Sequence, residues 1–203
     1  MKALVSIPPL LILLFLAGPG SVCGQNNSSI TMHAGPGFSH FAGAPYDSDV
    51  RTGFRGGVSL ELPREWLPFR LESGLWFMRK GVVERSQPGA GIRHDVLEFS
   101  LQALTGFGTE GAIRPHLMAG PRAGLTLGAS ASQGGSWFSI RDQVQHVTAG
   151  LVAAAGVSVE ADALLVTLRA HAGVDLTPLF QAAYSDGERH KEAALTIGIS
   201  LLQ

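Results

Sequence analysis

The residues best suited to chemistry in this chain are nine charged side chains that recur on one face of successive extended segments. Alternation at period two places apolar residues on the opposite face of the same segments. Five of the nine are arginines and four are carboxylic acids, so their charges nearly cancel. Because buried ions must pair or cost several kcal/mol each, this set suits a packed polar interior, and a gated pore is the alternative. The nine residues are Arg55, Glu61, Arg70, Glu72, Glu98, Arg114, Arg122, Arg169 and Asp175.

Two other patterns could bind ligands, and both are weak. Residues 106–111 read Gly-Phe-Gly-Thr-Glu-Gly and match a dinucleotide fingerprint, but Arg114-Pro115 and another extended segment follow where that motif requires a helix. The histidines at 33, 40, 94, 116, 146, 171 and 190 have no His-x-x-x-His spacing. We therefore expect no cofactor and no metal site.

The composition excludes several classes of protein. The chain has 203 residues, enough for one ordinary domain, and 26 of them are Gly. With 15 Lys and Arg against 16 Asp and Glu, no basic excess exists for binding nucleic acid. A single cysteine excludes a disulfide framework.

The first 24 residues are typical of a secretory signal peptide. Lys2 is followed by the apolar run Leu-Leu-Ile-Leu-Leu-Phe-Leu, and Val22-Cys23-Gly24 resembles a cleavage site. A spanning helix is disfavoured because Pro8 and Pro9 interrupt a run that is shorter than the roughly 20 residues required. We expect export, with residues 25–203 forming the mature domain.

The mature chain predicts an all-β fold. Apolar residues alternate with polar or small ones in each segment, as in Leu195, Ile197 and Ile199 against Thr196 and Gly198. The connections alternate between short turns and longer Gly-, Pro- and Ser-rich loops at 42–50, 81–91, 130–144 and 178–190. The predicted strands cover residues 29–41, 51–62, 67–80, 92–106, 112–129, 145–160, 163–177 and 191–202.

Three features favour an eight-stranded, antiparallel, up-and-down transmembrane β-barrel. The strands are longer than the roughly 5–6 residues usual in soluble proteins. The polar face is rich in Gly and in charges of both signs, which suits a narrow lumen. Aromatic residues near strand ends, including Trp66, Phe69, Trp76 and Phe77, suit interfacial girdles. The alternative is a soluble, lipocalin-like ligand carrier with its apolar face inside.

Three segments carry a resemblance to a family. Residues 71–81 read Leu-Glu-Ser-Gly-Leu-Trp-Phe-Met-Arg-Lys-Gly, and residues 96–101 read Val-Leu-Glu-Phe-Ser-Leu. Residues 114–121 read Arg-Pro-His-Leu-Met-Ala-Gly-Pro. Together they resemble the PorT-like outer-membrane β-barrel family. This chain has Ser100 at a position where that family usually has a proline. The resemblance implies a barrel in the outer membrane of a Gram-negative envelope, but most relatives have no defined activity.

We expect an outer-membrane protein with both termini periplasmic, a packed polar lumen and a structural, adhesive or envelope-interaction role. Its expected partners are outer-membrane lipids and an envelope or extracellular protein contacted by the four loops, where Trp137 and Phe138 are the contact candidates. A small-solute porin and a lipid-modifying enzyme remain alternatives, although no enzymatic activity is expected. Rim residues available to such an enzyme are His40, Asp47, Ser48, Ser185, Asp186 and His190.

Overall fold

A computed structural model describes residues 29–42, 48–62, 69–85, 87, 89–106, 113–181 and 188–201. The predicted signal peptide at 1–24 lies outside these residues. No helix in the described part of the chain is long and apolar enough to span a membrane. The elements are β1 (Ile30–Ala42), β2 (Ser48–Leu62), β3 (Arg70–Glu84), β4 (Gly91–Gly106), β5 (Ile113–Gln133), β6 (Ser136–Ser139), the 3-10 turn η1 (Arg141–Gln143), β7 (Val147–Ala161), β8 (Leu164–Asp175) and β9 (Arg189–Leu201).

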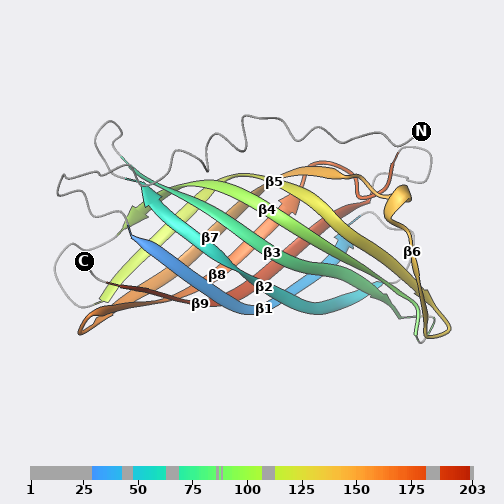
Figure 1. The fold of residues 1–203 in the computed structure, drawn as a ribbon, viewed down its shortest axis with the longest axis horizontal. Helices are drawn as coiled ribbons and strands as arrows, with labels where there is room; N and C mark the ends of the chain where they lie inside the picture. The colour runs from blue at the N-terminus through green and yellow to red at the C-terminus, as the bar shows by residue number, and fades with distance from the viewer. Residues whose placement is uncertain are drawn as a thin grey trace.

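Eight of these strands close into an antiparallel barrel, which confirms the predicted fold class (Figure 1). Each strand pairs with its neighbours in the chain, and β1 also pairs with β9 to complete the cylinder. The predicted strand boundaries differ from the observed ones by at most four residues. β6 is an additional short strand that pairs with the end of β5.

The two ends of the barrel differ in what connects the strands. The terminal end holds the start of β1, the end of β9 and the connections at 63–69, 107–112 and 162–163. The loop end holds the connections at 43–47, 85–90, 134–146 and 176–188, with β6 at the right of Figure 1. The predicted regular alternation of short and long connections is therefore wrong for the first two loops, because β2 and β3 extend into them.

The apolar face of each strand points outward and the polar face points inward. On β9, Leu195, Ile197 and Ile199 are exposed, whereas Thr196 and Ser200 are buried. The outward side chains of β9 are apolar from Ala193 to Leu201, and Lys191 and Arg189 follow toward the loop end. Crossing a bilayer takes about 9–11 tilted residues, so this band has the height expected of a transmembrane barrel.

A hairpin replaces the middle of the longest predicted loop. Gly134 and Gly135 both have positive φ values, 59° and 86°, and join Gln133 to Ser136 in adjacent register. Two residues with positive φ form the tight turn whose twist suits a β-hairpin. The sequence 130–139 lacks clear apolar alternation, which is why β6 was expected to be loop.

Candidate functional site

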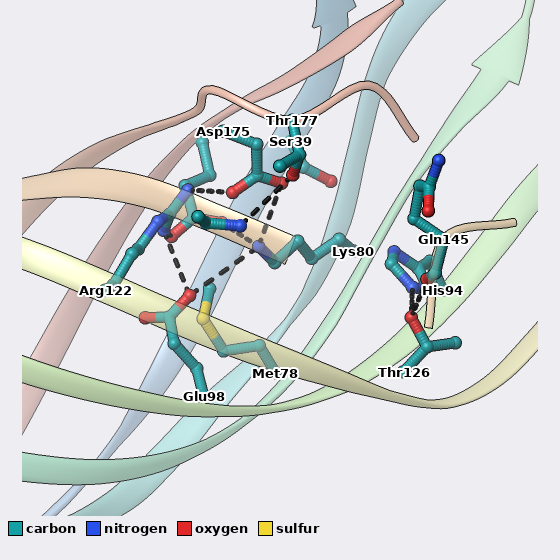
Figure 2. A network of polar contacts seen from close by, with 12 residues as sticks. Ser39, Met78, Lys80, His94, Glu98, Arg122, Thr126, Gln145, Asp175 and Thr177 are labelled. Carbon is teal, nitrogen blue, oxygen red and sulfur yellow. Dashed lines mark hydrogen bonds and ion pairs between the residues drawn. The ribbon is translucent and has the colours of Figure 1, made fainter. Parts of the chain in front are cut away.

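Six ionised side chains from six different strands meet inside the barrel and form what we call the central charge cluster. Each of them is at most 9% exposed. Three are cations and three are carboxylates, so their formal charges cancel. In Figure 2, four members converge from the surrounding strands toward one point, namely Lys80, Glu98, Arg122 and Asp175. The full cluster is Arg55 of β2, Lys80 of β3, Glu98 of β4, Arg122 of β5, Asp175 of β8 and Glu192 of β9.

Lys80 stands at the junction of the three carboxylates. Its Nζ lies 2.9 Å from Glu192 Oε2, 3.5 Å from Asp175 Oδ2 and 3.7 Å from Glu98 Oε2. One buried ammonium thus forms ion pairs with three carboxylates. Lys80 of β3 therefore links the neighbouring strand β4 to β8 and β9, which do not pair with β3.

The two arginines complete the cluster. Arg122 Nη2 donates to Asp175 Oδ1 at 2.7 Å, and its Nη1 lies 3.2 Å from Glu98 Oε2 and also contacts Glu192. Arg55 reaches Glu192 at 3.3 Å and Glu98 at 3.5 Å. Because each carboxylate faces two or more cations, no single pair can be removed without leaving buried charge unmatched.

Glycine on the inward face makes room for these long side chains. A Cβ at Gly173 would lie 2.6 Å from Arg122 Nη1 and 2.9 Å from its Cζ. Any larger residue would displace the guanidinium from Asp175. The abundance of Gly on the polar face is thus explained by the width of a barrel whose interior is filled by side chains.

A second layer of the lumen lies between the cluster and the terminal end. Arg169 donates from both Nη atoms to the two carboxylate oxygens of Glu72, each at 2.7 Å, and its Nε contacts His116 at 3.2 Å. Trp76 is fully buried and donates from Nε1 to Ser100 Oγ at 3.0 Å. The guanidinium of Arg55 lies over the Trp76 ring at 4.4 Å and connects this layer to the cluster.

Between the cluster and the loop end, His94 and His190 stack with ring centroids 5.5 Å apart. The Thr126 hydroxyl donates to the Gln145 carbonyl at 2.6 Å, so His94 Nε2–H donates to Thr126 Oγ1 at 2.8 Å (Figure 2). This chain of hydrogen bonds ties the lumen to the loop that precedes β7.

Residues 140–145 and 179–181 fold over the loop end and form what we call the loop cap. Ile140, Val144 and Leu179 are buried against Val82 and Ala129 of the barrel wall. Backbone hydrogen bonds join the two segments: Gln145 N donates to Leu179 O at 2.7 Å and Gln181 N to Gln143 O at 3.0 Å. The loop end is therefore covered by an apolar layer above the charged one.

The structure brings together six of the nine charged residues predicted for the lumen. Arg55, Glu98, Arg122 and Asp175 join the cluster, and Glu72 and Arg169 form the layer beneath it.

The other three, Glu61, Arg70 and Arg114, lie at the terminal end of the barrel. Arg70 pairs with Glu61 at 2.8 Å, and Arg114 pairs with Glu160; all four side chains are partly exposed. They sit on the inward face of their strands but at its edge, where water reaches them.

Two members of the cluster, Lys80 and Glu192, are absent from the predicted set. Both continue the inward alternation of their strands, Lys80 after Glu72 and Trp76, and Glu192 before Thr196. Following the period-two pattern from Trp76 through Met78 to Lys80, and from Thr196 through Ala194 to Glu192, would have found them. The interpretation of Trp76 as a girdle residue is likewise wrong, because it shares the inward face.

The remaining candidates fall in three places. Trp137 and Phe138 lie on β6 and are 45% and 51% exposed. His190 is buried inside the barrel, whereas His40 is partly exposed at the loop end. Asp47, Ser185, Asp186 and Trp66 lie outside the described residues, as does the side chain of Ser48. Among the residues that are described, no three His, Cys, Asp or Glu side chains are arranged to hold a metal ion.

The fold is that of solved outer-membrane β-barrels. It is similar to the crystal structure of Neisserial surface protein A (NspA), with a TM-score of 0.54, 17% identity, and coverage of 86% of this chain and 98% of that chain. OprG from Pseudomonas aeruginosa gives a TM-score of 0.49 at 13% identity over 88% and 97% of the two chains. Ail, the attachment invasion locus protein of Yersinia pestis, gives 0.44 at 15% over 86% and 99%.

At these identities the likeness concerns the fold alone, which is a closed antiparallel β-barrel. No protein-family model matches the sequence, and no curated protein matches it.

Proposed function

We propose that the protein is a non-conducting barrel of the outer membrane with a structural or adhesive role carried by its loop end. The outward apolar band and the fold shared with NspA support residence in that membrane. Export through cleavage of residues 1–24 would deliver it there. The PorT-like family is the proposed lineage, based on the resemblance of residues 71–81, 96–101 and 114–121.

The filled lumen is the observation that carries this proposal. A solute entering from the loop end would first have to displace Val144 and Leu179, and then separate Lys80 from its three carboxylates. Separating buried ion pairs costs several kcal/mol unless water replaces every contact. A small-solute porin would instead need a water-filled channel, which eight strands rarely enclose.

The arrangement also disfavours a lipocalin-like carrier and an enzyme. A carrier needs an apolar interior, whereas the central lumen described here holds six ionised groups. A lipid-modifying site would need His, Ser and an acid together on the outer rim, and His190, one of the candidates, faces inward. We therefore propose a role without catalysis, exerted by exposed residues such as Trp137 and Phe138.

Planar-bilayer recording tests the proposal. The barrel, purified in detergent and verified as folded by its heat-modifiable gel mobility, is inserted into a bilayer in concentrated KCl. We expect no steady current at any voltage, and sarkosyl fractionation of the host should place a tagged copy in the outer membrane. Discrete ohmic steps from wild-type protein would overturn the non-conducting role, and recovery in the soluble fraction would overturn the location.

A further inference from the structure

Two arginines on the outer wall of the barrel lie close to the ring of Trp137. The guanidinium carbons of Arg51 and Arg93 lie 5.2 Å and 5.1 Å from the centre of that ring. The three residues come from β2, β4 and β6, so the loop hairpin brings the ring to the two strands. We call this group the wall site.

The register places the wall site outside the lumen. Arg93 and Asp95 alternate with His94, which is buried in the interior beside Lys80. Trp137 pairs with Ser132, which pairs with Gly91, two residues from Arg93 and on the same face. The side chain of Arg51 reaches this face over Gly81 and Gly91. A Cβ at Gly81 would lie 2.8 Å from Arg51 Cδ, and a Cβ at Gly91 would lie 3.7 Å from Arg51 Nη1.

Within the part of the chain that the structure describes, no acid pairs with the arginines of the wall site. Among the described residues, neither Arg51 nor Arg93 forms an ion pair, and Arg51 Nε has no hydrogen-bond acceptor. Two acids near these arginines have other partners: Asp95 receives hydrogen bonds from Arg79 at 2.8 Å and 3.2 Å, and Asp49 pairs with Arg85. Two guanidiniums held around one ring without a counter-ion repel each other, and an anion between them would relieve that repulsion.

The position of the wall site along the barrel axis indicates which anion could reach it. Below Arg79 and Asp95 the outward side chains of β3 and β4 are Phe77, Leu97 and Phe99, which belong to the apolar band. Arg93 follows directly above Asp95 toward the loop end. Groups at this height meet the lipid headgroups of the leaflet at the loop end.

We propose that the wall site binds a phosphate group of an outer-leaflet lipid headgroup, held by Arg51 and Arg93 with Trp137 packed against the adjoining sugar. Guanidinium forks match phosphate oxygens in pairs, and an indole ring at the interface suits the polar-apolar boundary. The inference rests on the proposed membrane location, because a headgroup reaches this wall only if the barrel spans the leaflet.

Lipid titration of the detergent-solubilised full-length barrel tests the site. Native mass spectrometry would count bound lipid A carrying two phosphates, the same lipid after phosphatase treatment, and inorganic phosphate alone. We expect saturable binding of the phosphorylated lipid to wild type. The double variant Arg51→Gln/Arg93→Gln should bind it at least about tenfold more weakly than wild type does, since two charge-assisted contacts are lost. The dephosphorylated lipid should bind wild type as weakly as the phosphorylated lipid binds that variant.

Arg141→Gln is the matched control, because Arg141 is an exposed arginine of η1 at the same end of the barrel. It removes one positive charge and should bind lipid as wild type does. Trp137→Leu should weaken lipid binding while leaving both arginines in place. Unchanged heat-modifiable mobility would show that each variant folds, as expected for residues outside the lumen.

Each other outcome rejects part of the proposal. Equal affinity of wild type and the double arginine variant would remove the wall site. Inorganic phosphate that binds at the same concentrations and competes with the lipid would make the ligand a free anion and reject the lipid headgroup. These results are independent of fractionation and conductance, so failure of the wall site is distinguishable from failure of the proposed outer-membrane role.

Discussion

The central charge cluster and the wall site use the same residue types under opposite conditions. Inside the barrel, Arg122 contacts three carboxylates, and every member is buried. On the wall, Arg51 and Arg93 share an aromatic ring and have no carboxylate among the described residues. Burial forces pairing within the chain, whereas a partly exposed guanidinium can be left for a partner that the membrane supplies.

The largest expected effect comes from breaking the cluster at its junction. Lys80→Met leaves three buried carboxylates facing two arginines, which should lower the free energy of unfolding by about 3–5 kcal/mol. Urea unfolding in micelles, followed by tryptophan fluorescence and gel mobility, measures this change. Lys191 supplies the control, because it precedes the cluster residue Glu192 on β9 but is exposed, so Lys191→Met should stay within about 0.5 kcal/mol of wild type.

A second substitution sharpens that result. Lys80→Met/Glu192→Gln restores the balance of formal charge in the lumen, so its unfolding free energy should fall by less than the sum of the two single changes. Strict additivity would mean that the two groups do not interact, in conflict with their 2.9 Å contact.

A smaller effect is expected at the loop cap. Leu179→Ala removes a buried side chain that packs against Val144 and Ile140, and should destabilise the cap by about 2–3 kcal/mol. Hydrogen exchange should become faster at the amides of Gln145 and Gln181, which bond across the cap, while β9 stays protected. Equal acceleration in β9 would mean that cap and barrel open as one unit.

The smallest effect belongs to the terminal end. Arg114 is 49% exposed and pairs with Glu160 at the edge of the barrel, so Arg114→Leu should cost less than about 1 kcal/mol. Glu98→Leu, made inside the cluster, should cost several times more in the same urea titration. If the two variants lost equal stability, depth in the lumen would not govern the value of an ion pair.

The alternation of apolar and polar residues predicts which face of a strand each side chain lies on, and this limits how much of the structure the sequence could predict. Alternation defines the face of each residue, which is why Arg55, Glu98 and Arg122 were assigned to the interior. It contains no information on depth, so Glu61, Arg70 and Arg114 received the same assignment although they lie at the edge. Depth depends on strand tilt and stagger, which arise only when the barrel closes.

The wall site could not be predicted from the sequence for a different reason. It depends on a hairpin at Gly134-Gly135 that places Trp137 opposite Ser132 of β5, and on an arginine of β2 that reaches over Gly81 and Gly91. Arg51 and Trp137 are 86 positions apart in the sequence, and no repeat or motif joins them. Trp137 was identified as a contact residue, but its two arginine neighbours were not.

Cysteine labelling in lipid vesicles tests most directly the claim that apolar residues face lipid around a closed, ionic lumen. Thr196 is fully buried in the lumen and Ile197, its neighbour, is 57% exposed on the wall. In a Cys23→Ser background, a lipid-soluble maleimide should label Ile197→Cys and leave Thr196→Cys unreacted, and a charged maleimide should label neither until the barrel is unfolded by heat. Labelling of Thr196→Cys by the charged reagent in the folded barrel would show an open lumen, and its labelling from the lipid would show that the faces are reversed.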